Sequence, residues 1–263
     1  MEILGYFISI LIGIVLGLIG GGGSILTVPV LVYLFEINPE NATSYSLFIV
    51  GITAMVGVYR HSLMGNLKLK PAVVFAFPSV FSVLLTRKIL LPLIPNQIGG
   101  LRDFVISKDV LIMVVFAILM IWASIMMIKN TKKRADVFQI IDYKKLAFFG
   151  FLIGFLIGFL GAGGGFLIIP ALLFFANLPM KQAVGTSLLI IFINSTIGFA
   201  GDVFAGIRLD YGLLFSVSGI AICGMFIGTA LSKKIEGERL KPFFGWFVLL
   251  MGLCIVFKEL FGF

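Results

Sequence analysis

The stretch Gly20-Gly-Gly-Gly-Ser24 lies between two apolar segments, and a similar stretch, Gly161-Ala-Gly-Gly-Gly165, lies in the second half of the chain. As one straight helix, Ile3 to Phe35 would span about 50 Å, whereas the hydrocarbon core of a bilayer is about 30 Å thick. Because glycine lowers helix propensity by up to about 1 kcal/mol per residue, four in a row should break the helix. Backbone groups freed in this way cannot face lipid, so each glycine stretch is a candidate functional site.

The composition is that of a membrane protein. The chain has 263 residues, of which 60% are hydrophobic and 12% are charged, and its mean hydropathy is +1.16. Such values predict an all-α polytopic membrane protein whose main partner is the lipid bilayer. The net charge of +8 comes from basic residues in short loops, where they indicate orientation and contact with anionic lipid. No nucleic-acid recognition motif is present, so we expect no nucleic-acid partner.

Two further features of the sequence exclude other classes. Cys223 and Cys254 both lie in apolar runs, so we interpret them as packed residues and not as a disulfide or a metal site. The start, Met1-Glu2-Ile3, has no basic region and no small-residue cleavage site, so we interpret it as mature membrane sequence.

Apolar segments and breaks predict the order of the helices. The segment from Ile25 to Phe35 carries Pro29 in its first turns and is too short to span a bilayer, so we expect a half-helix capped by Ser24. A loop from Thr86 to Asp109 precedes the last span of the first half. The predicted spans are Asn41 to Tyr59, Pro71 to Leu85, Val110 to Ile128, Lys181 to Ala200, Tyr211 to Leu231 and Lys241 to Phe261.

The two halves of the chain are internal repeats. A shift of 141 residues aligns Gly17 to Pro29 with Gly158 to Pro170 without a gap. The same shift aligns two ladders of small residues, spaced four apart, which predict close helix contact. The ladders are Ser9, Gly13, Gly17 and Gly21 in the first half, and Gly150, Gly154, Gly158 and Ala162 in the second. We therefore divide the chain into a first transmembrane repeat (1–128), a basic cytoplasmic linker (129–145) and a second repeat (146–263).

Basic residues predict the relative orientation of the repeats. If each broken segment enters the membrane and returns to its own side, more of the 20 lysines and arginines lie on the side of the linker than if each segment crosses once. The positive-inside rule therefore favours inverted repeats with both termini outside. Inverted repeats whose broken helices meet near the midplane are a recurrent design of secondary transporters.

The paired glycine breaks, each followed by a proline (Pro29 and Pro170), and the two four-segment halves resemble the sulfite exporter TauE/SafE family of bacterial and archaeal permeases. The resemblance covers nearly the whole chain. It implies secondary transport of a small sulfur-containing anion, such as sulfite, thiosulfate or an organosulfonate, across the plasma membrane of a prokaryote. The chain departs from twofold symmetry in the loop from Arg87 to Lys108, which has no equal in the second half and whose role we leave open.

The residues also point to an anion without the resemblance. A half-helix that begins at Ser24 or Gly165 presents unpaired N–H groups and the positive end of the helix dipole, and hydroxyl and amide side chains in the following spans could complete the contacts. The alternatives are that the glycines only allow close packing and that the hydroxyls bond to their own backbone. The candidate substrate-binding residues are Gly21, Gly22, Gly23, Ser24, Ser44, Ser46, Gly163, Gly164, Gly165, Thr186, Ser187 and Asn194.

His61 and Asp202 are weak candidates for gating or proton coupling. The shift of 141 residues aligns them, but the inverted arrangement places them at opposite faces, so they should not pair. A position at a loop end near solvent is the favoured reading for both. The single histidine and the scattered carboxylates form no metal-ligand cluster, so we predict no metal and no cofactor.

Other functions remain as alternatives. An intramembrane serine protease would need a histidine base near Ser24, but His61 is expected at the membrane edge, so we predict that the chain is not an enzyme. No P-loop occurs, which leaves no ATPase in this chain. A membrane potential that is negative inside drives an anion outward by about 2.3 kcal/mol per charge per 100 mV, which favours export. An anion channel and a proton-coupled importer stay open, as does a homo-oligomeric state.

Overall fold

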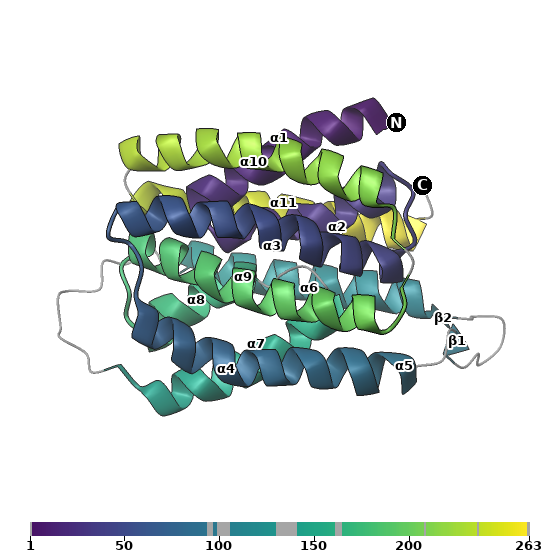
Figure 1. The fold of residues 1–263 in the computed structure, drawn as a ribbon, viewed down its shortest axis with the longest axis horizontal. Helices are drawn as coiled ribbons and strands as arrows, with labels where there is room; N and C mark the ends of the chain where they lie inside the picture. The colour runs from purple at the N-terminus through teal and green to yellow at the C-terminus, as the bar shows by residue number, and fades with distance from the viewer. Residues whose placement is uncertain are drawn as a thin grey trace.

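The computed structural model describes residues 2–93, 97–98, 106–129, 141–160, 165–207, 209–235 and 237–261. These residues form a bundle of helices, together with one antiparallel pair of two-residue strands, β1 (Gln97–Ile98) and β2 (Ile106–Ser107) (Figure 1). The predicted all-α class is therefore confirmed, apart from this short pair.

Both glycine stretches separate short helices. The first half consists of α1 (Glu2–Ile19), the 3-10 turn η1 (Gly21–Gly23), α2 (Ser24–Tyr33), α3 (Pro39–Leu63), α4 (Leu69–Leu85), the π-helical turn η2 (Thr86–Leu90), α5 (Leu91–Leu93) and α6 (Lys108–Lys129). The second half consists of α7 (Tyr143–Leu160), α8 (Gly165–Phe175), α9 (Met180–Phe204), α10 (Tyr211–Lys234) and α11 (Gly237–Phe261).

Four of the described helices are long and apolar enough to cross a membrane: Pro39–Leu63, Leu69–Leu93, Met180–Phe204 and Tyr211–Lys234. The second of these shows that the predicted loop from Thr86 to Asp109 was partly wrong, because the helix continues through the π-turn to Leu93. Leu4–Ile19, Ser24–Tyr33, Val110–Trp122 and Gly245–Phe257 are shorter apolar helices. The chain is a membrane protein that combines helices long enough to span a bilayer with shorter apolar helices.

The bundle has two distinct ends. Figure 1 shows the N- and C-terminal ends of the chain close to one end, which we call the terminal end, while α6 ends and α7 begins at the opposite end, which we call the linker end. The Lys70 ammonium lies 4.7 Å from the centroid of the Tyr143 ring, which places the start of α4 beside the start of α7 at the linker end. In the same view α3 runs from the terminal end to the linker end, and α9 runs in the opposite direction.

The broken segment of each half packs against a helix of the other half. α1 packs on α10, and α7 packs on α4. A Cβ atom at Gly13 would overlap the carbonyl of Ala221, and one at Gly154 would overlap the carbonyl of Ser79. The prediction that the small-residue ladders mediate close helix contact is therefore confirmed at these positions, and the contact joins the two halves.

The cysteines correct one expectation. Cys223 on α10 and Cys254 on α11 are both exposed free thiols, so the prediction that they are packed inside the protein was wrong. Their helices are apolar on more than one face, with Phe226 and Leu253 also exposed, so an apolar neighbourhood in the sequence did not distinguish packing against protein from exposure to lipid.

Candidate functional site

The two glycine breaks meet in space. A Cβ atom added to Gly21 would overlap the Cα of Gly165, and one added to Gly165 would overlap the Cα of Gly21. Backbone can approach backbone this closely only where neither residue has a side chain. We call Gly20–Gly23 together with Gly165 the glycine junction. The predicted proximity of the breaks is confirmed for these residues, whereas the candidates Gly163 and Gly164 lie outside the described residues.

Gly20 produces the first break. Its N–H still bonds to the carbonyl of Leu16 at 2.7 Å, but its φ of 71° and ψ of −127° leave the helical region, and L-residues with side chains rarely adopt this conformation. A Cβ at Gly20 would stand 2.8 Å from Oγ of Ser187 and 2.9 Å from the carbonyl of Val184. The break is therefore held against the first turns of α9.

Ser24 does not cap the half-helix as predicted. The N-cap of α2 is Gly23, without a side-chain hydrogen bond, and Ser24 is the first helical residue. Its hydroxyl donates to the carbonyl of Gly21 at 2.6 Å, so it bonds back to the broken backbone. The capping prediction was wrong because the single 3-10 turn of η1 moves the start of α2 to Ser24 itself.

The other predicted donors lie inside the protein but do not converge on one point. Ser187 donates back to the carbonyl of Val184 at 2.8 Å, and Thr186 accepts a hydrogen bond from the backbone N–H of Lys68 at 3.1 Å. The amide of Asn194 donates to Oγ of Ser79 at 2.7 Å, while its Oδ1 has no partner among the described residues. The buried Ser46 hydroxyl likewise has no partner in the described part of the chain.

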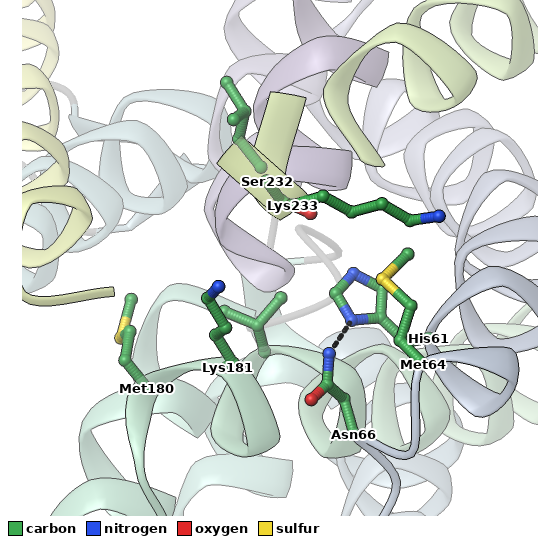
Figure 2. A pocket seen from close by; sticks show the side chains of 9 residues that line it. His61, Met64, Asn66, Met180, Lys181, Ser232 and Lys233 are labelled. Atoms are coloured by element: carbon green, nitrogen blue, oxygen red, sulfur yellow. Dashed lines mark hydrogen bonds between the residues drawn. The ribbon is translucent and has the colours of Figure 1, made fainter. Parts of the chain in front are cut away.

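A cavity of about 260 Å³ opens at the linker end. It lies where α3 and α10 end and α9 begins, and Leu18, two residues before Gly20, forms part of its wall. Figure 2 shows labelled side chains from all three of these elements around the space. Its lining residues are Leu18, His61, Met64, Asn66, Met180, Lys181, Val184, Ser232 and Lys233, with two ammonium groups and no carboxylate among them. The charges of the lining residues therefore favour an anion, and part of the cavity wall comes from residues next to the glycine junction.

His61 is a buried polar residue of this cavity. It is 2% exposed, which contradicts the favoured reading of a loop-end residue near solvent. Its Nδ1 lies 3.4 Å from the amide nitrogen of Asn66, and its Nε2 has no partner among the described residues (Figure 2). The final turns of α3 continue four residues beyond the predicted end at Tyr59, and this extension carries His61 into the protein.

Asp202 lies elsewhere, as the inverted arrangement predicted. It is 5% exposed, so the expectation of a solvent-exposed position is wrong for this residue too. The Arg87 guanidinium pairs with its carboxylate, and the Ser44 hydroxyl donates to Oδ2 at 2.6 Å. Ser44 is thus a donor to Asp202 in this structure.

Arg87 was not among the predicted site residues, because it was expected to lie in the loop from Thr86 to Asp109. The signal that could have found it is an arginine that follows Leu84-Leu85-Thr86 without an intervening Gly, Pro or Asn, as expected where a helix continues. Its buried partner Asp202 lies in an apolar helix, where ionisable residues are usually paired.

The comparisons with known proteins agree on one family. The model described as "Sulfite exporter TauE/SafE" matches residues 6–255. A probable membrane transporter protein of Xylella fastidiosa (strain Temecula1) is 30% identical over 259 residues, which cover 95% of this chain and 92% of that protein. The probable membrane transporter protein YdhB of Bacillus subtilis is 28% identical over 256 residues, 95% of this chain and 98% of that protein. No solved structure matches the chain significantly.

Proposed function

Because the chain belongs to the sulfite exporter TauE/SafE family and is a membrane transporter of that type, we propose that it moves a small sulfur-containing anion across the plasma membrane of a prokaryote. Sulfite, thiosulfate and organosulfonates are the substrates to test. Each presents oxygen atoms on a compact anionic centre, which suits backbone N–H groups and ammonium groups as ligands.

The observation that carries this proposal is the cavity beside the glycine junction. Leu18 and Val184 line the cavity, and Val184 also lies against Gly20 at the break. An anion would be attracted by Lys181 and Lys233, would meet the buried His61 and would then reach the start of α2. There the helix dipole and the N–H groups at the N-terminus of α2 stabilise negative charge without a fixed cation.

The arrangement of the helices supports alternating access. In Figure 1, α1 enters from the terminal end and α2 runs back toward it, whereas α7 enters from the linker end and α8 runs back toward that end. This is the pattern expected of inverted repeats, which we propose for the chain, with the glycine junction as the fixed site between them. The cavity belongs to the linker end, and the Arg87–Asp202 pair lies toward the terminal end.

We propose export as the direction. With the linker in the cytoplasm, the cavity would face the cell interior, and an inside-negative potential would drive an anion outward by about 2.3 kcal/mol per charge per 100 mV. The second candidate is an importer that couples the anion to a proton, and the buried His61 and Asp202 are the groups that could carry it. An anion channel would use the same junction without alternating access.

Flux in proteoliposomes tests the proposal. The purified chain is reconstituted, and uptake and efflux of labelled sulfite, thiosulfate and an organosulfonate are measured with the membrane potential and the pH gradient imposed separately. We expect saturable counterflow of at least one of these anions and acceleration of net efflux by an inside-negative potential. Non-saturating conductance with single-channel steps would favour the channel, and the absence of flux for all three anions would contradict the proposed substrate class.

A further inference from the structure

The guanidinium of Arg87 is the point where four elements meet toward the terminal end. Its Nε donates to Oδ1 of Asp202 at 2.7 Å, and its Nη2 donates to Oδ2 of the same carboxylate. Nη2 also donates to Oγ of Ser44 at 3.0 Å, and Nη1 donates to the carbonyl of Gly158 at 3.3 Å. The π-turn, α9, α3 and α7 are thus joined through one side chain.

The Arg87–Asp202 ion pair is buried, so each of its two charges is stabilised by the other. Both side chains are 7% exposed, and Asp202 supplies the one carboxylate that contacts the guanidinium among the described residues. A buried ion that loses its partner must find another or be hydrated. Arg87 presents two parallel N–H groups to the two oxygens of Asp202, which is also the geometry with which arginine binds oxyanions.

The position of the pair is related to the proposed transport path. Gly158, which accepts from Arg87, lies in the last turn of α7, directly before the second glycine break. Gly17 precedes Gly20 by three residues, just as Gly158 precedes Gly161. The backbone of Gly17 lies beside the His61 ring at the cavity. His61 and Ser44 lie on the same helix, about 25 Å apart at 1.5 Å per residue. The helix before each break therefore contacts one buried ionisable residue: His61 beside α1 and Arg87 beside α7. These two residues lie near opposite ends of α3.

The two ends of the path differ in state. At the linker end the Nε2 atom of His61 has no hydrogen-bond partner among the described residues, and His61 lines a cavity together with two lysines. At Arg87 the hydrogen bonds to Asp202, Ser44, Thr43 and Gly158 occupy the guanidinium. The structure is thus open at the cavity and closed at the pair.

We propose that Arg87 and Asp202 form an exchange gate: the transported oxyanion displaces the Asp202 carboxylate from the Arg87 guanidinium, and this exchange separates α9 from the π-turn and opens the terminal end. The inference rests on the proposed transport function and adds to it a substrate-binding residue and the contact that closes one end. Ser44, which donates to Oδ2 of Asp202, continues to stabilise the carboxylate when Arg87 has left it.

Anion affinity distinguishes an exchange gate from a pair that only holds helices together. In the Asp202→Asn variant the competing carboxylate is gone, so we expect the Kd for thiosulfate to fall by at least about fivefold, while counterflow slows because the bound anion is no longer displaced. In Arg87→Gln we expect the Kd to rise by about tenfold or more, and Arg87→Lys, which keeps the charge, should fold and bind with intermediate affinity. A Kd for thiosulfate in Asp202→Asn that is equal to or higher than that of the wild type would overturn the proposal that the anion and Asp202 compete for Arg87.

Asp210 offers a matched control near the same end. It is a carboxylate that caps α10 by accepting from the N–H groups of Gly212 and Leu213, and asparagine can make the same contacts. We expect Asp210→Asn to leave both the affinity and the counterflow unchanged. An affinity gain in Asp210→Asn equal to that in Asp202→Asn would show a general charge effect and would contradict the gate.

A second measurement needs no transport. Leu47 lies one turn beyond Ser44 on α3, is 0% exposed and packs against Gly198 on α9. In a background with Cys223→Ser and Cys254→Ser, the Leu47→Cys thiol is labelled with a membrane-impermeant maleimide in nanodiscs. We expect slow labelling that accelerates with saturating thiosulfate, and fast labelling without anion when Arg87→Gln or Asp202→Asn is added. A labelling rate that is the same with and without thiosulfate and in all variants would overturn the gate, even where flux is present. The absence of flux for every tested anion would instead contradict the proposed function, whatever the labelling shows.

Discussion

His61 shows at the scale of one residue how the cavity would recognise an anion. The imidazole is buried, it contacts Asn66 through Nδ1, and its Nε2 faces the cavity without a partner in the described part of the chain. A buried nitrogen without a hydrogen bond is costly, so a ligand that supplies an acceptor gains the full bond.

We therefore expect His61→Ala to weaken thiosulfate binding by about tenfold, the effect of one hydrogen bond to a charged group. Titration calorimetry of the purified protein measures this change. Ser62→Ala is the neighbouring control, because Ser62 is exposed and its hydroxyl donates to the carbonyl of Tyr59 in its own helix. Equal affinities for wild type and His61→Ala would remove His61 from the site.

The sequence singled out polar residues in apolar helices, but it did not predict their hydrogen-bond partners. Ser24, Ser44, His61 and Asp202 stay candidates, and the structure shows that they are buried and that some of their contacts join residues far apart in the chain. Ser44 and Asp202, for example, are 158 residues apart. Periodicity and spacing describe one element at a time, so the Arg87–Asp202 pair could not be derived from either half alone.

At the scale of elements, the small-residue ladders decide how the halves fit together. Gly154 on α7 lies against the backbone of Ser79 on α4, without room for a methyl group. Apolar packing between helices in a membrane gains from such close contact, since lipid offers no hydrophobic driving force.

We expect Gly154→Ala to destabilise the protein by about 1–3 kcal/mol, because the added methyl group must push α7 away from α4. Thermal unfolding in detergent measures the difference. Gly219→Ala on α10 serves as the control, because nothing lies within 4 Å of the added atom. A melting temperature of Gly154→Ala at or above that of Gly219→Ala would contradict the close contact.

Element boundaries were predictable where the sequence carries local signals. Asn38 accepts from the N–H groups of Glu40 and Asn41 and, with Pro39, fixes the start of α3 within three residues of the predicted start. The π-turn at Thr86–Leu90 has no such signal, because it contains no Gly, Pro, Asn or Asp, and its Arg87 bonds to Asp202 on α9, which is far along the chain.

At the scale of the whole molecule, the internal repeat was the most informative feature of the sequence. The shift of 141 residues predicted that the two glycine stretches are equivalent, and the contact of Gly21 with Gly165 bears out their proximity. The repeat could not indicate that α1 packs on α10 and α7 on α4, because a sequence alignment of two halves contains no information about contacts between them.

Orientation in the membrane stays a prediction, with both termini outside and the linker at 129–145 inside. Reporter fusions after Phe263 and after Arg134 test it in cells. We expect the fusion after Phe263 to be active only with a reporter that functions outside, and the fusion after Arg134 only with one that functions in the cytoplasm. Activity of both fusions on the same side would refute the inverted arrangement.

Counterflow of labelled thiosulfate through variants of the glycine junction tests whether the anion passes through this junction. A methyl group at Gly21 or Gly165 would strike the backbone of the other, so we predict that Gly21→Ala and Gly165→Ala each lower counterflow by about tenfold or more while size-exclusion chromatography shows a folded protein. Gly219→Ala should transport as the wild type does. Wild-type counterflow in folded Gly21→Ala and Gly165→Ala proteins would show that the anion does not pass through the glycine junction.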